Sequence, residues 1–487
     1  MDAGKNSPPP PMADGGSRKR VCYYYDPRIF DVDYGAKHPM VPRRVSMAHA
    51  LVRAYDLLDD MDLLRVAPAT KEDLMPTHDG AYLDLLRDLT PAAYHRDGGL
   101  QAEAGKRKLG QFEEQDRRGC WKINDDNPVI AGLWDYCLRY AGGSLAAARA
   151  LAGGGYRVAI NWSGGMHHAC HGEAGGFCYV NDIVVAVRAL LGRFRRVLYV
   201  DVDAHHGDGV EAAFADDPRV MTVSFHQYDG VDFFPGTGKV DDVGGEHARY
   251  RALNVPLEAG TGDERYHALF RPITARAMEV FRPGAVVLQS GADSLAGDRI
   301  AGLGLSVRGH AKCLRLLLGY DVPLLLLGGG GYTINHVAAC WCYETAVAIG
   351  KEIPNEIPEH GYKGYYKSQD YELHYGAEGG GGGGETKHMA DVKRKVMGHL
   401  DKLAAELSRQ PDEEEPPDQG VAVFDGGALL ERSPAGGEEE EDPVEVLHRR
   451  CGEEDLAKFL IHLGRTRARA ASQERTRTTP EASRRRR

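Results

Sequence analysis

The 487-residue sequence has no long hydrophobic run and no apolar stretch at its amino terminus. No segment approaches the roughly 18 consecutive apolar residues of a membrane helix, so we expect no membrane association. The first residues, MDAGKNSPPPPMADGG, lack the apolar core of a secretory signal. We therefore expect a protein that stays inside the cell.

Cysteine is scarce, and its count of nine is odd. Several cysteines lie in apolar segments such as GFCY at 176–179 and CWC at 340–342. A disulfide framework is typical of small secreted chains with paired cysteines, so this pattern favours reduced, buried thiols. A cytoplasmic or nuclear compartment follows.

Positive charge is sparse over most of the chain, whose net charge is −11. Residues 411–445 carry 13 acidic residues and one basic residue, whereas 463–487 carry nine arginines and two glutamates. Binding to a phosphate backbone needs clustered Lys and Arg, so we expect no direct sequence-specific nucleic acid binding. The run Arg484–Arg487 resembles a nuclear import signal, which favours the nucleus, with the cytoplasm as a second location.

Composition divides the chain into three parts. Residues 1–20 are rich in Pro and Gly and predict a disordered tail, and 21–375 predict one globular domain. Residues 376–487 are Gly-rich, then acidic, then Arg-rich, and predict a low-complexity tail. Apolar residues at helical spacing predict a helix near 391–407 that packs on the body or on a partner.

Within the body, short apolar runs alternate with segments of helical periodicity such as 181–193 and 309–318. The predicted strands are 157–161, 197–202, 220–225, 285–289 and 323–327. Their near-continuous hydrophobicity is typical of strands buried on both faces. The sequence therefore predicts an α/β fold with a central, mostly parallel sheet flanked by helices.

Polar or glycine-rich sequence follows each predicted strand. These segments are WSGGMHH, DAHHGD, SFH, SGAD and GGGGY, beginning at residues 162, 203, 224, 290 and 328. The carboxyl ends of parallel strands meet at one edge of a sheet, and ligands bind there. We therefore expect a single site built from these segments.

A metal site is predicted from Asp203 and His205, which are spaced i and i+2 where a strand ends, and from Asp293 at another strand end. One imidazole and two carboxylates leave open positions on a divalent ion, as in catalytic zinc sites. The alternative is that these acids are buried caps of helix starts.

The adjacent His167 and His168 predict acid–base chemistry, with Asp201 and Asp208 as orienting carboxylates. Such pairs fix the imidazole tautomer and suit one group that accepts a proton and one that protonates a leaving amine. The alternative is a pair of hydrogen-bonded core histidines. Cys170 and His171 follow closely, but without a CxxC partner we do not expect them to be further zinc ligands.

The GGGGY segment at 328–332 lacks the Lys-Ser/Thr of a phosphate-binding loop and the spacing of a dinucleotide site. It instead presents Tyr332, whose hydroxyl would hydrogen-bond an oxyanion opposite the metal, unless it is a core tyrosine. Phe177 and Phe234, in Gly- and Pro-rich settings, would wall a narrow apolar slot or be core aromatics. An acidic turn at 125–128 would accept hydrogen bonds from a peptide backbone, or be an ordinary Asx turn.

Taken together, HPM at residue 38, GGMHHA, GGFCYVNDI, VDVDAHHGDGV, FFPGTG, SGADSLAGDR and GGGGYT resemble the class I zinc-dependent histone deacetylases over residues 21–375. The resemblance implies a single arginase/deacetylase-type domain. It also implies hydrolysis of the acetyl amide of N6-acetyl-lysine in histones and other proteins, which gives lysine and acetate. Transcriptional repression with corepressor subunits as partners is implied as well.

The same resemblance implies roles for single residues. The zinc ligands would be Asp203, His205 and Asp293. The catalytic residues would be His167, His168, Asp201, Asp208 and Tyr332. Acetyl-lysine and its backbone would contact Asp126, Gly176, Phe177, Phe234 and Ile300. A structural potassium ion would lie at Asp201, Asp203, His205, Ser224 and Phe225.

The chain departs from this class at three places. Val41 and Asn335 replace a Lys and an Arg that hold inositol phosphate in the class, which leaves only Arg299, so we expect weak or absent inositol-phosphate binding. Cys170 and His171 replace the usual Lys-Lys, which changes the charge near the slot. The tail is short and ends in arginines.

Three other functions stay open at this point: an amidohydrolase of small acetylated amines, an arginase-like binuclear manganese enzyme, and a non-catalytic corepressor scaffold. Tyr332 and the single Asp-His-Asp set disfavour the binuclear enzyme. Asp126, suited to a peptide backbone, disfavours a small amine. A scaffold would not need the intact set of polar residues.

Overall fold

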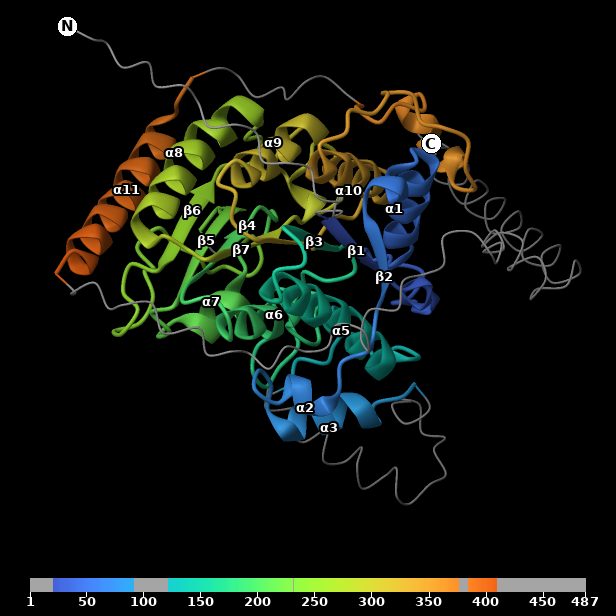
Figure 1. Ribbon diagram of the computed structural model, residues 1–487, viewed down its shortest axis with the longest axis horizontal. Helices are drawn as coiled ribbons and strands as arrows, with labels where there is room; N and C mark the ends of the chain where they lie inside the picture. The colour runs from blue at the N-terminus through green and yellow to red at the C-terminus, as the bar shows by residue number, and fades with distance from the viewer. Residues whose placement is uncertain (1–20, 92–120, 231, 376–383, 410–487) are drawn as a thin grey trace, which may run out of the picture. The chain divides into compact units, whose positions relative to one another are not determined.

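The computed structural model describes residues 21–91, 121–230, 232–375 and 384–409 (Figure 1). The predicted tail at 1–20, most of the segment from 376 onward and the Arg484–Arg487 run lie outside the described residues. Among the described residues, no helix is long and apolar enough to cross a membrane.

A single eight-stranded sheet forms the centre, in the order β2-β1-β3-β8-β7-β4-β5-β6, and all its neighbours pair in parallel. The strands are β1 Val21–Tyr25, β2 Asp62–Arg65, β3 Val158–Asn161, β4 Val197–Asp201, β5 Val220–Gln227, β6 Ala252–Leu257, β7 Ala285–Gln289 and β8 Leu324–Leu327. The predicted α/β fold is thereby confirmed. The five predicted strands correspond to β3, β4, β5, β7 and β8, whereas β1, β2 and β6 were not predicted.

Helices cover both faces of the sheet (Figure 1). The α-helices are α1 Arg43–Ala54, α2 Lys71–Leu74, α3 Gly80–Asp88, α5 Leu133–Ala152, α6 Asp182–Leu191, α7 Asp208–Phe214, α8 Asp263–Phe281, α9 Val307–Leu318, α10 Ile334–Ile349 and α11 Lys387–Leu407. Four 3-10 helices are described, namely η1 Pro27–Asp31, η2 Leu57–Asp60, η3 Ala292–Ser294 and η4 Lys363–Gln369.

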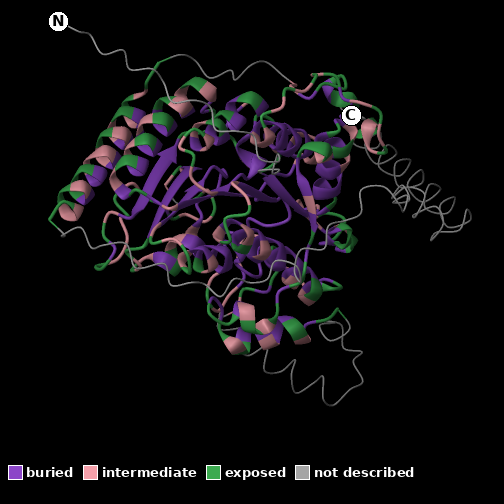
Figure 2. Ribbon diagram, viewed as in Figure 1, coloured by how far each residue is buried: buried purple, intermediate pink, exposed green. Residues whose placement is uncertain are grey.

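The core consists of two hydrophobic clusters, one on each face of the sheet. Val197 and Tyr199 of β4 face the cluster of α5, α6 and α7, whereas Leu198 and Val200 face the larger cluster that includes α1, α8, α9 and α10. Successive side chains of a strand point to opposite faces, so both faces of a central strand must be apolar. Figure 2 shows the resulting continuous buried layer through the sheet.

Helix α11 lies beyond residue 375 and packs against α8 and β6. Its first turn is capped by the Thr386 hydroxyl, which accepts a hydrogen bond from the Met389 amide at 3.1 Å. Val396 and Leu400 are fully buried, and Arg251 forms an ion pair with Glu406 at 3.0 Å. The packed body therefore continues to the end of α11.

Candidate active site

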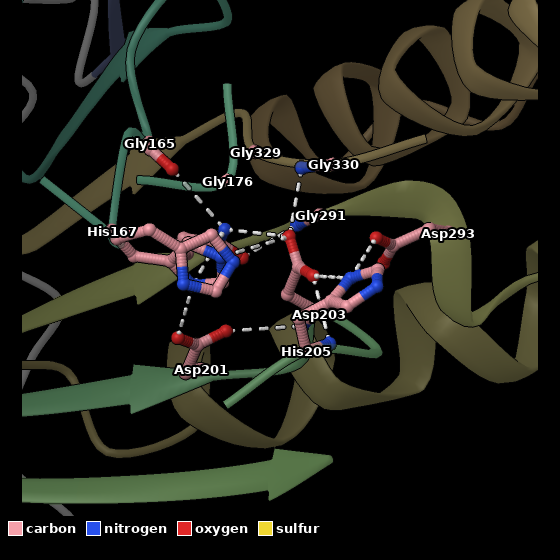
Figure 3. Close-up of polar contacts among 12 residues, drawn as sticks. Gly165, His167, Gly176, Asp201, Asp203, His205, Gly291, Asp293, Gly329 and Gly330 are labelled. Atoms are coloured by element: carbon pink, nitrogen blue, oxygen red, sulfur yellow. Dashed lines mark hydrogen bonds and ion pairs between the residues drawn. The ribbon is translucent and has the colours of Figure 1, made fainter. Parts of the chain in front are cut away.

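The polar segments after β3, β4, β7 and β8 converge at the carboxyl edge of the sheet (Figure 3). Strand β4 ends at Asp201, so Asp203 and His205 lie in the loop after the strand. Asp293 lies in η3, the short helix that follows β7. The central strands, buried on both faces, fix the points from which these loops depart.

Asp203, His205 and Asp293 meet in this loop cluster, and all three are buried. The Nδ1 atom of His205 is 2.9 Å from Asp293 Oδ2 and 3.2 Å from Asp203 Oδ1. The three potential ligand atoms lie within 4.8 Å of one another. The structure therefore brings together the residues predicted to hold zinc.

Backbone and amide donors occupy the other oxygen of each carboxylate. Asp203 Oδ2 accepts from Gln289 Nε2 at 2.8 Å and from the Gly330 amide at 2.7 Å. Asp293 Oδ1 accepts from the Ala204 amide at 2.7 Å. The second oxygen of each carboxylate faces the His205 imidazole, and Asp203 Oδ1 also accepts a hydrogen bond from the His205 amide at 3.0 Å. Hydrogen bonds of this kind orient ligands in metal sites.

The charges at this cluster favour a bound cation. Burial and the neighbouring Asp203 charge raise the pKa of Asp293 to about 7. Burial opposes a charged His205, but contacts with Asp203 and Asp293 outweigh it and raise the pKa of His205 to about 10. Two buried carboxylates therefore attract positive charge between them, and two carboxylates with one imidazole fit a divalent metal ion.

The paired histidines lie beside this cluster, each against a carboxylate. His167 Nδ1 is 2.8 Å from Asp201 Oδ2, and His168 Nδ1 is 2.7 Å from Asp208 Oδ1. The two imidazole rings are 3.9 Å apart. Their loop is anchored by buried Asp182, which accepts hydrogen bonds from the Gly165 and Met166 amides.

The two histidines differ in protonation. Burial disfavours a charged His167, but Asp203 and Asp201 outweigh burial and raise its pKa to about 9. Burial and the neighbouring His167 charge lower the pKa of His168 to about 4. A group poised to donate a proton therefore lies beside a group poised to accept one.

Tyr332 is presented by the glycine-rich loop after β8. Its amide donates to Asp298 Oδ2 at 2.8 Å, and burial holds the pKa of its hydroxyl well above the usual value. The buried guanidinium of Arg44 donates to the carbonyls of Gly329 and Gly331, both at 2.5 Å. The loop is thereby fixed, and Tyr332 keeps its proton as a hydrogen-bond donor.

Aromatic rings lie beside Tyr332 and the paired histidines, where the sequence analysis predicts an apolar slot. Phe177 meets Tyr332 edge to face at 5.7 Å between ring centroids, and Phe234 meets His168 at 5.0 Å. A Cβ on Gly176 would overlap the His168 ring and lie 2.9 Å from Phe234. Glycine is therefore needed at 176 for these rings to approach.

The remaining predicted substrate residues are exposed. Phe234 is 46% exposed and Ile300 is 41% exposed. Asp126 is also exposed, and its carbonyl accepts a hydrogen bond from His38 Nε2 at 3.1 Å. The His38 ring contacts Phe177 at 4.6 Å, which links the acidic turn to the slot wall.

The predicted potassium residues lie at the end of β4, in the loop that follows it and within β5. Ser224 is paired with Asp201 in the sheet, and its hydroxyl contacts His226 Nδ1 at 2.9 Å. Asp201 Oδ2 also accepts from the Tyr199 hydroxyl at 2.5 Å. Phe225 follows in the same strand.

Cys170 and His171 lie apart from the metal cluster. His171 Nδ1 donates to the Thr77 carbonyl at 2.8 Å. Cys170 lines a groove of about 820 Å³ with His206, Asp208 and Asp241. In the described part of the chain, neither residue belongs to a group of potential metal ligands.

Three residues that the sequence analysis did not identify support the site. Gln289 orients Asp203, Arg44 holds the glycine-rich loop, and Asp298 fixes the Tyr332 backbone. Gln289 ends a predicted strand, which was the only sequence signal for it. Arg44 is distant in sequence from the loop it holds, so no local pattern relates the two.

Comparison with known proteins agrees with this geometry. The family model of the histone deacetylase domain matches residues 38–348. Histone deacetylase 19 of Arabidopsis thaliana is 46% identical over 427 residues, which cover 87% of this chain and 80% of that protein. Histone deacetylase 1 of Homo sapiens is 42% identical over 385 residues, which cover 79% of this chain and 76% of that protein. The predicted resemblance is confirmed, and the chain belongs to the histone deacetylase family.

Proposed function

We propose that the protein hydrolyses the acetyl amide of N6-acetyl-lysine in histones and other proteins, with one zinc ion held by Asp203, His205 and Asp293. The observation that carries the proposal is the meeting of these three side chains with His167, His168 and the rings of Phe177 and Phe234 at one edge of the sheet. When bound, zinc supplies Lewis-acid polarisation of the substrate carbonyl and of the attacking water.

The slot selects the substrate. The apolar stem of acetyl-lysine lies between Phe177 and Phe234, and the exposed Asp126 carboxylate accepts a hydrogen bond from the peptide backbone at the entrance. At the inner end, the neutral Tyr332 hydroxyl donates a hydrogen bond to the acetyl oxygen as negative charge develops there. An exposed apolar rim of Phe234 and Ile300 suits an extended peptide.

The two histidines move the protons. Neutral His168 accepts a proton as the water oxygen bonds to the carbonyl carbon, and Asp208 stabilises the resulting imidazolium. The carbon–nitrogen bond then breaks, and the leaving nitrogen takes a proton from His167, which Asp201 orients. The products are lysine and acetate.

A potassium ion is part of the proposal as a structural cofactor. It would be held at the end of β4, the loop after it and the middle of β5, by Asp201, Asp203, His205, Ser224 and Phe225. Its positive charge would lie beside the buried Asp201 and Asp203 carboxylates.

We place the activity in the nucleus, within transcriptional repression and with corepressor subunits as partners. The support is similarity to proteins named histone deacetylases, together with the Arg484–Arg487 run. The cytoplasm is a second location.

We infer that inositol phosphate does not bind tightly at the position that serves it in related proteins. Asn335 donates to Gln369 Oε1 at 2.8 Å, so an uncharged amide stands where a cation would be needed. Val41 supplies no charge. A titration of inositol tetrakisphosphate against deacetylase activity should show no activation at micromolar concentrations; clear activation there would refute this inference.

The proposal is tested by acetate release from acetyl-lysine histone peptides by the purified full-length chain. We expect release that a chelator or a hydroxamate abolishes and that stoichiometric zinc restores after chelation. An acetylated small amine such as acetylputrescine serves as the competing substrate. No release from folded, zinc-loaded protein, or a preference for the small amine, would contradict the proposal.

A further inference from the structure

The turn that leads from β7 to Asp293 is held by three buried side chains from α9 and α10. Ser290 Oγ donates to Glu344 Oε2 at 2.8 Å, and Trp341 Nε1 donates to the Ser290 carbonyl at 2.9 Å. His310 Nε2 donates to the Gly291 carbonyl at 2.9 Å. None of these side chains is exposed, so no water competes for their hydrogen bonds.

The protonation of His310 follows from its partners. The Gly291 carbonyl can only accept, so Nε2 carries a hydrogen. His310 Nδ1 is 2.8 Å from Glu344 Oε1, and a second hydrogen lies in that contact. Burial opposes a charged imidazole, but Cys340 and Glu344 outweigh burial and hold the pKa of His310 well above its usual value. His310 and Glu344 therefore form a buried ion pair.

The same residues also resemble a metal site. Potential ligand atoms of His310, Cys340 and Glu344 lie within 4.8 Å of one another. Both nitrogens of His310 and both carboxylate oxygens of Glu344 nevertheless already have hydrogen-bond partners. Within the described part of the chain, this polar network is complete without an ion.

The turn is in direct contact with the candidate zinc ligands. A Cβ on Gly291 would overlap the Asp203 carboxylate, so the turn backbone packs against that ligand. The next amide, of Ala292, donates to the Gly330 carbonyl at 2.9 Å, and Asp293 follows immediately. A displacement of Gly291 would therefore move Asp293 and change the space available to Asp203.

We propose that His310 and Glu344 are positioning residues that fix the Ser290–Gly291 turn and thereby hold Asp203 and Asp293 at the spacing that one zinc ion requires. The inference rests on the proposed function, because it concerns the same zinc site. Neither residue is among those assigned to substrate or zinc. Outer hydrogen bonds of this kind typically change metal affinity by about 10- to 100-fold when they are removed.

The test measures zinc dissociation constants of the full-length chain by competition with a chromophoric chelator. His310→Phe keeps a ring but loses the N–H groups, and we expect the zinc Kd to rise by about 10- to 100-fold. With saturating zinc, kcat should fall while KM for the peptide stays within about twofold, because the slot is unchanged.

Glu344→Gln is the conservative variant. Its amide can accept from Ser290 Oγ and donate to Nδ1 of a neutral His310, so every hydrogen bond of the turn can persist. We expect a zinc Kd within about threefold of the wild-type value. If His310→Phe does not fold, Ser290→Ala removes a single hydrogen bond, and its zinc Kd should rise by about 3- to 10-fold.

Cys340→Ala is the matched control, because it removes the 3.5 Å contact of Cys340 Sγ with His310 Nδ1 but keeps the hydrogen bonds of His310, Glu344 and Trp341 to the turn. Its zinc Kd should equal that of the wild type. A wild-type Kd in His310→Phe or Ser290→Ala would overturn the proposal, even if the melting temperature fell. The proposal would also be overturned if the wild-type chain bound two zinc ions and Cys340→Ala bound one, because the second ion would then lie at His310, Cys340 and Glu344. A wild type that binds zinc but releases no acetate would overturn the proposed function alone.

Discussion

At the scale of single residues, the candidate site depends on how hydrogen bonds orient its carboxylates and its tyrosine. Asp203 and Asp293 each have one oxygen occupied by amide donors and one that faces His205. Tyr332 is fixed through its backbone, by Asp298, and its hydroxyl is kept protonated by burial. Asp203 Oδ1 also accepts from the His205 amide, so hydrogen bonds hold the atoms assigned to chemistry in one orientation.

Tyr332→Phe removes only the proposed donor to the acetyl oxygen. We expect kcat for an acetyl-lysine peptide to fall by about 100- to 1000-fold, the usual cost of losing one oxyanion donor. The melting temperature should be unchanged, because the loop is held by Arg44 and Asp298.

Tyr266→Phe is its control. The Tyr266 hydroxyl is buried and has no hydrogen-bond partner in the described structure, so its loss should change neither turnover nor folding. Near-normal turnover of Tyr332→Phe would rule out the proposed role of its hydroxyl.

Asp203→Ala should abolish stoichiometric zinc binding, because it removes one of three ligands. Metal analysis after dialysis is expected to give about one zinc per wild-type chain and almost none in the variant. Asp391→Ala, on the outer surface of α11, is the control and should retain zinc. Full zinc content together with activity in Asp203→Ala would contradict the ligand assignment.

At the scale of secondary-structure elements, one face of α10 supports two loops of the site. Trp341, Glu344 and Thr345 are spaced i, i+3 and i+4 and therefore share a face of the helix. Trp341 stacks on Trp162 at 5.4 Å, just after β3, and Glu344 binds the turn after β7. A single helix thereby ties the histidine loop to the Asp293 loop.

The strands that could be predicted are those buried on both faces, because an uninterrupted apolar run is a signal in itself. The strands that were not predicted lie toward the edges of the sheet. Strand β2 has only four residues, with a charge at each end, and β6 contains Asn254 and Pro256. These polar residues and the proline interrupt the apolar run, so the sequences resemble loops even though every residue of β6 is buried.

The candidate site was largely predictable for a related reason. Its residues follow the predictable strands, and parallel pairing brings the strand ends together whatever the loops contain. The supporting contacts of Arg44, Gln289 and His310 were not predictable, because each joins segments distant in sequence.

Leu400→Ala tests whether α11 is an integral part of the folded body. Leu400 is fully buried between this helix and its neighbours, so we expect the free energy of unfolding to fall by about 2–4 kcal/mol in urea titrations. Arg394→Ala, on the exposed face of α11, should change it by less than about 0.5 kcal/mol. If the two variants had the same free energy of unfolding, α11 would not pack on the body as described.

At the scale of the whole molecule, buried histidines make stability depend on pH. Burial and Arg53 lower the pKa of His49 to about 3, and burial lowers that of His78 to about 4. In the unfolded chain both titrate near 6.5. The unfolded state therefore binds more protons between pH 6.5 and 4, and the free energy of unfolding falls as the pH falls through that range.

His49→Phe should reduce this pH dependence. Its ring can still stack on Tyr25, as the His49 ring does at 3.7 Å. Between pH 7 and pH 5, we expect the loss of unfolding free energy to be about 2 kcal/mol smaller in the variant than in the wild type. Urea titrations at both pH values measure the free energy of unfolding. His247→Gln is the control, because His247 is exposed. If His49→Phe and the wild type lost the same unfolding free energy between pH 7 and pH 5, His49 would not be kept neutral in the folded state.

The position of β8 has a consequence for how the chain is made. The last strand in the sequence lies in the middle of the sheet, between β3 and β7. A ribosome adding about 5–20 residues per second needs roughly 10–30 s to proceed from the end of β3 at Asn161 to the end of β8 at Leu327. During that interval the nascent chain exposes the unpaired edge of β3, and the edge of β7 is added only after residue 289 has been made. The strand order therefore delays closure of the sheet until β8 has been synthesised.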